Sequence, residues 1–214
     1  VTLMVFLVGP DRFLVLRRLI MKHSLRFALA ACLVCAYAAS AEDATDKNLV
    51  PNGGFEQSVA DEGSVPTDWV PFTSKNVVLG TSRLAKRDGE QSLRMSAQKI
   101  PNAFQGVNHI MPITPGSKYT FSAFFMNDKN DPLKNTATGM LVIEWKSADD
   151  KEMSRTLSKM WDPGLSKLRW EQISINNAEP PKGAVSATFG IHFCDGKSGA
   201  SGSVFVDDVM LIEK

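Results

Sequence analysis

Short runs of residues that favour β-strands, separated by turn residues, fill the chain from about residue 48 onward. The runs are rich in Val, Ile, Phe, Thr and Trp, whereas Gly, Pro, Asn and Asp gather between them. No segment shows a convincing amphipathic helical stripe with capping residues at its ends. Many short strands with regular turns are typical of an antiparallel β-sandwich or jelly roll, so we predict an all-β fold of that class. We expect strands over residues 68–72, 76–81, 92–97, 104–113, 118–127, 138–147, 168–176, 184–194 and 203–212.

The size and charge of the chain fit one such domain. Of 214 residues, about 170 remain after the amino-terminal region, which suffices for two sheets and a core between them. A hydrophobic fraction of 43% excludes intrinsic disorder. A net charge of +1 gives no general attraction to nucleic acid or to an anionic membrane, so we expect no nucleic-acid partner.

Residues 21–41 have the three parts of a secretory signal peptide. Lys22 and Arg26 make a positive start, residues 27–37 are apolar, and residues 39–41 (Ala-Ser-Ala) form a small-x-small cleavage site. A membrane anchor is the alternative, but about 15 apolar residues are short for a span of about 20. We therefore expect a secreted or periplasmic protein without a membrane span in its mature part, which begins at Glu42.

Three further expectations concern the amino-terminal region. Residues 1–20 are interpreted as an over-called start, because a complete signal begins at Met21. Residues 42–47 form a polar lead-in to the domain. The sequence Leu-Ala-Ala before Cys32 resembles a lipoprotein cleavage site, which makes a lipoprotein anchored at Cys32 the second alternative. Since Cys32 and Cys35 fall within the signal, the mature chain keeps only Cys194 and has no internal disulfide.

Strand alternation indicates which side chains face away from the core. In residues 119–126 the inward set is Tyr119, Phe121, Ala123 and Phe125, which leaves Phe124 on the other face. The same reasoning places Glu144 and His192 opposite the apolar sets of their strands. An aromatic ring with hydrogen-bonding neighbours on an exposed sheet face could stack on and grip a sugar ring. The alternative is a face that is merely solvated or covered by a loop.

Motifs of enzyme chemistry are missing. The sequence contains neither His-Glu-x-x-His nor Gly-x-Ser-x-Gly, and residues 196–198 (Gly-Lys-Ser) lack the spacing of a phosphate-binding loop. The mature chain has only two histidines, His109 and His192, and no Cys/His cluster with zinc spacing. A catalytic triad or a glycosidase carboxylate pair assembled from distant residues is not marked by any motif. We therefore expect a protein that is not an enzyme.

Six sequence segments, in order, resemble the carbohydrate-binding modules of families four, nine, sixteen and twenty-two. The resemblance spans about residues 48–214 and implies a jelly-roll fold. The segments are residues 48–56 (Asn-Leu-Val-Pro-Asn-Gly-Gly-Phe-Glu) with 66–69 (Pro-Thr-Asp-Trp), 88–93, 113–122, 168–173, and 204–211 with its Asp-Asp pair.

This resemblance implies a structural calcium ion. Gly54 and Gly89 would offer backbone carbonyl groups, and Glu56 and Asp207 would offer carboxylates. Ca²⁺ binds about 6–8 oxygen ligands, among them carboxylates and backbone carbonyl groups. These four residues therefore offer ligands of the right chemical kind. The alternative is a capping or salt-bridge role for Glu56 and Asp207.

The resemblance also implies a polysaccharide or oligosaccharide partner, bound across a concave sheet face or at loops along one edge. It implies that the strands of Phe124, Glu144 and His192 share one sheet. Gln105 and His109 share a strand face and are further candidates to bond hydroxyls, and Trp161 is a candidate loop platform or lid. Trp69 and Trp170 are expected in the core. The function expected is an exported, non-catalytic carbohydrate-binding module. The alternatives are a structural or adhesive cell-surface module without sugar binding, and a small glycan-active hydrolase.

Overall fold

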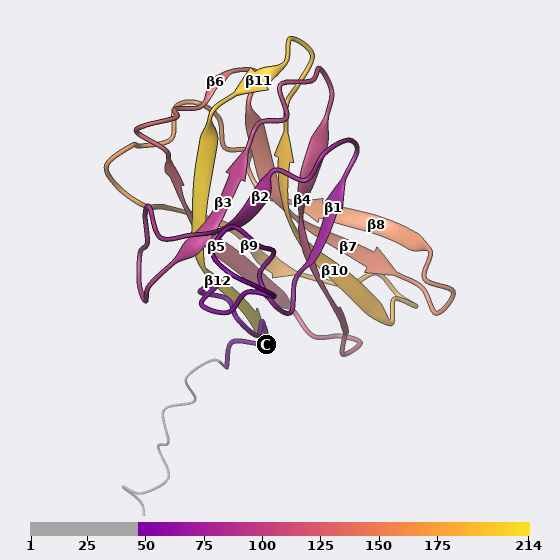
Figure 1. The fold of residues 1–214 in the computed structure, drawn as a ribbon. Helices are drawn as coiled ribbons and strands as arrows, with labels where there is room; N and C mark the ends of the chain where they lie inside the picture. Colours follow the sequence, from indigo (N-terminus) through magenta and orange to yellow (C-terminus); the bar gives the residue numbers. More distant parts are fainter. Residues whose placement is uncertain (1–46) are drawn as a thin grey trace, which may run out of the picture. The chain divides into compact units, whose positions relative to one another are not determined.

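The computed structural model describes residues 47–214. The expected over-called start, the signal peptide, the cysteine at 32 and all of the lead-in except Lys47 lie outside the described residues. Two five-stranded antiparallel sheets form the framework of the described chain (Figure 1). Within residues 47–214, no helix is long and apolar enough to cross a membrane.

The first sheet has the strand order β1-β4-β10-β7-β8, and the second has the order β2-β3-β12-β5-β9. A two-stranded ribbon, β11-β6, adds to them. The first sheet contains β1 (Val70–Thr73), β4 (Phe104–Pro112), β10 (Ser186–Cys194), β7 (Thr138–Lys146) and β8 (Glu152–Leu157). The second contains β2 (Leu79–Ser82), β3 (Ser92–Ser96), β12 (Ser203–Glu213), β5 (Tyr119–Asn127) and β9 (Glu171–Ala178), and the ribbon contains β11 (Ala200–Ser201) and β6 (Lys134–Asn135).

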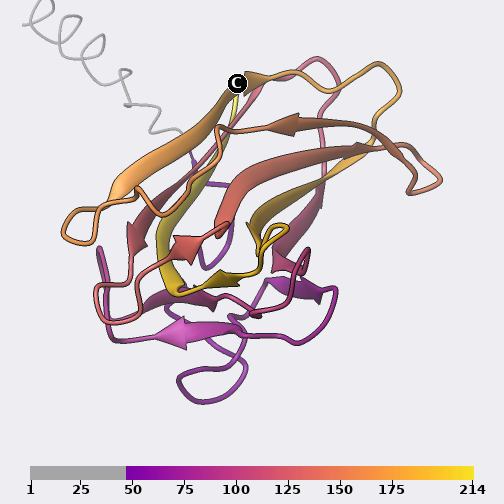
Figure 2. The ribbon, with the colours of Figure 1, turned by 90° about the horizontal axis from the view of Figure 1, so that it is seen from above.

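The two sheets pack face to face as a sandwich, which confirms the predicted fold class (Figure 2). Every expected run contains a strand. The strand β8 was missed because it is an edge strand whose residues are nearly all exposed, so its sequence has no apolar face to detect. The two-residue strands β6 and β11 are too short to leave a periodic signal.

The inward-facing side chains of both sheets form one apolar core. The inward sets expected for residues 119–125, 141–145 and 187–193 are confirmed, because all of these side chains are buried. Phe121 of β5 and Phe189 of β10 meet across the sandwich edge to face, with ring centroids 5.5 Å apart. Trp69 belongs to the core as expected. Trp170, also expected there, is partly exposed just before β9.

Candidate functional site

The outer face of the first sheet carries the side chains that alternate with the core residues. Strand register places them in rows that cross the strands, because directly paired residues of antiparallel strands point to the same side. One row runs through Met140, His192, Gly106 and Phe72. The next runs through Leu157, Val142, Gly190, Asn108 and Val70, and a third through Arg155, Glu144, Thr188 and Ile110.

The middle of this face is covered by neighbouring side chains, several of them polar. Val142 and Thr188 point outward, yet they are only 1% and 2% exposed. Gly190 lies between Asn108 and His192, and a Cβ atom at Gly190 would come within 2.6 Å of both Asn108 Oδ1 and His192 Nε2. Because Gly190 has no side chain, the side chains of Asn108 and His192 can lie directly against its backbone.

An aromatic cluster lies at one end of the face. The rings of Phe72 and His192 have centroids 4.6 Å apart, and Phe72 and Phe104 are 6.3 Å apart. Phe104 is 47% exposed, so part of this aromatic surface is open to a ligand. Exposed aromatic rings beside polar groups are a surface on which an amphipathic ring can stack.

Two buried polar atoms of this face have no hydrogen-bond partner. They are Asn108 Oδ1 and Thr188 Oγ1. Leaving a buried donor or acceptor unpaired costs about 1–3 kcal/mol, so such groups usually have a bound water or ligand as partner. Both atoms belong to neighbouring rows of the same face, beside Gly190. Each atom lies beneath the surface of the face, so a water molecule or a ligand group that reaches it would supply the missing hydrogen bond.

The charged groups of this face are paired with one another. Arg155 lies 3.1 Å from Glu144 and also binds Glu152, at 2.6 Å from its Nε. Burial, with a smaller contribution from the positive charge of Arg155, lowers the pKa of His192 to about 4. His192 is therefore a neutral imidazole at physiological pH, with one nitrogen that donates and one that accepts a hydrogen bond. The face offers polar groups without an unpaired cation, which suits an uncharged ligand.

The expectation that Phe124 shares this sheet with Glu144 and His192 is wrong. Glu144 and His192 do lie on the outer face of the first sheet, but Phe124 lies in β5 of the second sheet. There the guanidinium of Arg87 stacks on the Phe124 ring at 3.7 Å. Alternation within a strand separates inward from outward residues, but it does not identify the sheet to which the strand belongs.

Two other sequence candidates point away from this face. Gln105 is fully buried on the core side of β4, where its Oε1 accepts from the Val78 amide and its Nε2 donates to the Ser96 carbonyl. His109 shares that inner side as expected, and it contacts the edge of Trp69. Gln105 is therefore a structural link between the sheets and not a ligand contact.

Trp161 is a core residue, so the expectation of a loop platform or lid is wrong. Only 2% of Trp161 is exposed, and its ring packs edge to face on Phe193 with centroids 5.1 Å apart. A Cβ atom at Gly139 would meet the Trp161 ring at 2.1 Å, so the indole lies directly on that glycine. Residues 159–165 are mostly polar or turn-forming, so the sequence around Trp161 does not predict that its side chain is buried.

The four residues implied as calcium ligands come from separate segments but lie near one another. A Cβ atom at Gly54 would be 3.9 Å from Asp207 Oδ1 and 3.7 Å from Glu56 Cγ, and one at Gly89 would be 2.2 Å from Glu56 Oε1. Among residues 47–214, no three His, Cys, Asp or Glu side chains are grouped for a metal, so carbonyl oxygens would have to complete the coordination.

The environment of Asp207 is compatible with a cation. Its side chain is fully buried. Burial raises the pKa of Asp207 to about 6, although hydrogen bonds from the backbone amides of Arg87 and Asp208 oppose the rise. A buried carboxylate without a neutralising side chain is costly, and a nearby cation would relieve that cost. Both carboxylates already accept hydrogen bonds from backbone amides, Glu56 from Glu90 and Gln91 and Asp207 from Arg87 and Asp208, which is the capping role expected as the alternative. A calcium ion would share these oxygens, and its effect there would be to tie the segment around Gly54 to β12.

Five residues of the outer face were not among the site residues expected from the sequence, although alternation places Thr188 on an outward face: Phe72, Phe104, Asn108, Arg155 and Thr188. The signal for three of them was present, because Phe104, Asn108 and Thr188 alternate with core residues in strands that were correctly expected. Phe72 and Arg155 belong to the short edge strands β1 and β8, where alternation carries little information.

The fold is that of carbohydrate-binding modules of the β-sandwich type. A family 61 carbohydrate-binding module (TmCBM61), solved with β-1,4-galactotriose, matches 78% of this chain and 99% of its own, with 13% identity and a TM-score of 0.52. The CBM22-1–GH10 modules of Clostridium thermocellum xylanase 10B, solved with xylohexaose, match 77% of this chain and 28% of theirs, with 18% identity and a TM-score of 0.55. The resemblance stated from the sequence is confirmed at the level of the fold.

The same fold also occurs in a protein named as an enzyme. The Stig cyclase Fisc from Fischerella sp. TAU matches 78% of this chain and 96% of its own, with 14% identity and a TM-score of 0.51. Several other matching chains are much longer, and this chain spans only 21% to 28% of them. Neither a family model nor a curated protein matches the sequence. At these identities the likeness concerns the fold, so function has to be argued from the site itself.

Proposed function

We propose that this protein is an exported, non-catalytic module that binds carbohydrate across the outer face of the first sheet. The observation that carries the proposal is the pair of buried, unpartnered oxygen atoms, Asn108 Oδ1 and Thr188 Oγ1, on the same sheet face as the partly exposed rings of Phe72 and Phe104. The sugar complexes of proteins with the same fold support it. Export rests on the signal-like residues 21–41, and sequencing the amino terminus of protein from the native host should read from Glu42.

The chemistry of the face matches that of a sugar. A pyranose presents apolar C–H groups on one side, which can lie on Phe72 and Phe104, and hydroxyl groups around its rim. Each hydroxyl loses hydrogen bonds to water on binding, and the site must replace them. Asn108, Thr188 and neutral His192 supply such replacements. Glu144 is held by Arg155, which argues against its use as a free catalytic acid and supports a binding role.

The test begins with a glycan array that identifies the preferred sugar and continues with Thr188→Val. Valine has the shape of threonine without the hydroxyl, so the variant should weaken sugar binding roughly two- to tenfold, the loss of one hydrogen bond of ~0.5–1.5 kcal/mol. Its stability should be unchanged or higher, since a buried unpaired hydroxyl is removed. Calorimetric titration and urea denaturation measure the two effects.

Thr81→Val is the matched control. Thr81 Oγ1 is also buried without a partner, but it lies in β2 of the second sheet. This variant should leave the affinity for sugar unchanged. Equal losses of affinity in both variants, or no loss in Thr188→Val, would contradict the proposed site. Failure of every glycan to bind the protein would favour a structural or adhesive module instead.

The proposal includes a structural calcium ion held by Gly54, Glu56, Gly89 and Asp207. Chelation should lower the melting temperature of the protein without removing the fold. A ligand at 100-fold excess over its Kd stabilises a protein by ~2.7 kcal/mol. Asp207→Ala should abolish the response to added calcium in a thermal melt. Identical melting curves of the unaltered protein with chelator and with calcium would assign these acids a purely structural role.

A further inference from the structure

A second surface of different character lies on the outer face of the second sheet. A hollow of about 250 Å³ opens there between three loops. Its floor consists of Phe205 of β12 and Met126 of β5, which are paired across the sheet. Leu84, Lys129, Lys167 and Leu168 line it from the surrounding loops. The hollow is smaller than the ~300–1,000 Å³ typical of small-molecule sites, so it would take one or two side chains.

Two leucines of this hollow are unusually exposed. Leu84 is 70% exposed and Leu168 is 85% exposed, whereas Phe205 on the floor is 3% exposed. Single exposed apolar residues are common, but here two of them border one depression with an apolar floor. Together they offer an apolar surface that a bound side chain would remove from water.

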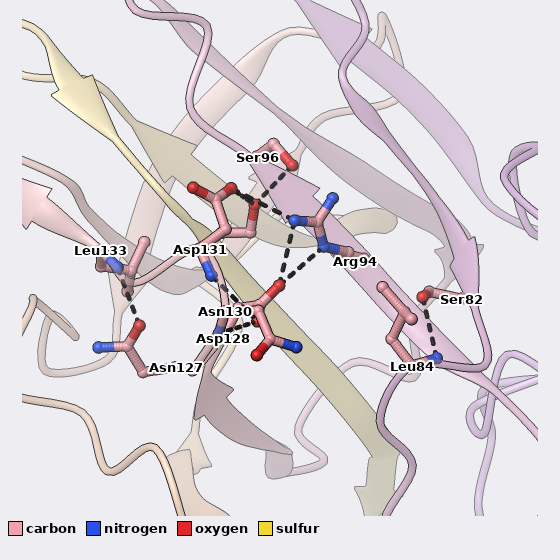
Figure 3. A network of polar contacts seen from close by, with 10 residues as sticks. Ser82, Leu84, Arg94, Ser96, Asn127, Asp128, Asn130, Asp131 and Leu133 are labelled. Atoms are coloured by element: carbon pink, nitrogen blue, oxygen red, sulfur yellow. Dashed lines mark hydrogen bonds and ion pairs between the residues drawn. The ribbon is translucent and has the colours of Figure 1, made fainter.

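The carboxylates beside the hollow are already bonded. Asp128 accepts hydrogen bonds from Arg94, which also reaches Asp131, and Figure 3 shows the Arg94 guanidinium between these two carboxylates. By contrast, none of the carboxylates in residues 47–214 forms an ion pair with Lys129 or Lys167. This surface therefore lacks the unpartnered oxygens of the first sheet, and it has unpaired positive charge instead.

We propose that this hollow docks an exposed segment of a partner protein in which a large apolar side chain is flanked by acidic residues. The apolar side chain would lie between Leu84 and Leu168 on Phe205, and its acidic neighbours would face Lys129 and Lys167. An anionic membrane is disfavoured because the hollow is concave and the chain as a whole is nearly balanced in charge, at +1. This docking surface is separate from the sugar-binding face and does not depend on it.

The probe is a short capped peptide with one phenylalanine flanked on each side by glutamates. One buried side chain and two surface ion pairs give weak binding, with a Kd on the order of 1 mM, which the methyl NMR shift of Met126 on the floor of the hollow can follow in every variant. The pair Leu84→Ala and Leu168→Ala should weaken binding at least tenfold. The pair Lys129→Glu and Lys167→Glu should reverse the preference toward a peptide with lysines in place of the glutamates. Val59→Ala, an exposed apolar residue outside both surfaces, is the control and should change nothing.

Three results would overturn the proposal. One is equal binding of the acidic and the basic peptide to the unaltered protein. Another is peptide binding that persists in the double leucine variant. The third is sedimentation of the protein with phosphatidylglycerol vesicles through the same leucines and lysines, without any response to the acidic peptide, which would make this surface a membrane contact. Sugar affinity measured on the same variants should stay constant in every case.

Discussion

Replacing Trp161 with alanine should destabilise the protein by about 3–5 kcal/mol, the usual cost of removing a large buried aromatic side chain. The indole fills the space between Phe125, Phe193 and the bare backbone of Gly139. No neighbour can fill the resulting cavity without moving a strand, because interiors are closely packed. Urea denaturation at neutral pH, with calcium held constant, measures the loss.

Trp170→Ala is the matched control for this prediction. Trp170 is partly exposed and lies outside the buried cluster, so its removal should cost clearly less. Equal losses for the two tryptophans, or a loss below about 1 kcal/mol for Trp161→Ala, would contradict the core position of Trp161 and return it to the loop role.

The second large effect is a dependence of stability on pH that originates from His192. Its pKa is about 4 in the folded protein and ~6.5 in the unfolded chain. Between these values the unfolded state binds more protons, so the contribution of His192 to stability should fall as the pH falls from about 6.5 to 4 and should level off below that. A difference of ~2.5 units at ~1.36 kcal/mol each makes the full loss about 3 kcal/mol.

The variant His192→Gln isolates this effect, because glutamine does not titrate. Asp207, whose pKa is raised, acts in the opposite direction and is present in both proteins. The difference in unfolding free energy between the two proteins should therefore change by about 3 kcal/mol from pH 7 to pH 4. Parallel stability curves over this range would show that His192 is solvated in the folded state.

The sequence was sufficient to predict the β-sandwich fold and to identify the inward-facing residues of its central strands. Alternation in segments such as Tyr119–Met126 reports burial directly, because every second side chain of a half-buried strand enters the core. The placement of Glu144 and His192 on an outward face followed from the same pattern. The relation between Gly54, Glu56 and Asp207 came from motif resemblance, and their proximity in the fold agrees with it.

The composition of the candidate site could not be obtained from the sequence in the same way. Which strands share a sheet depends on pairing between distant segments, and this separated Phe124 from His192. The burial of Trp161 depends on Gly139, which precedes it by more than twenty residues. The unpartnered oxygens of Asn108 and Thr188 become evident only when all their neighbours are known. Such features arise from long-range contacts, on which local patterns carry no information.

The most direct test of the carbohydrate-binding face compares Phe72→Ala with Phe124→Ala in a titration with the sugar that the array selects. Both phenylalanines are partly exposed and point outward, but Phe72 lies on the first sheet and Phe124 on the second. We expect Phe72→Ala to weaken binding at least tenfold, about 1.4 kcal/mol, and Phe124→Ala to leave it unchanged. The reverse result, lost binding in Phe124→Ala and full binding in Phe72→Ala, would place the sugar on the second sheet and contradict the account.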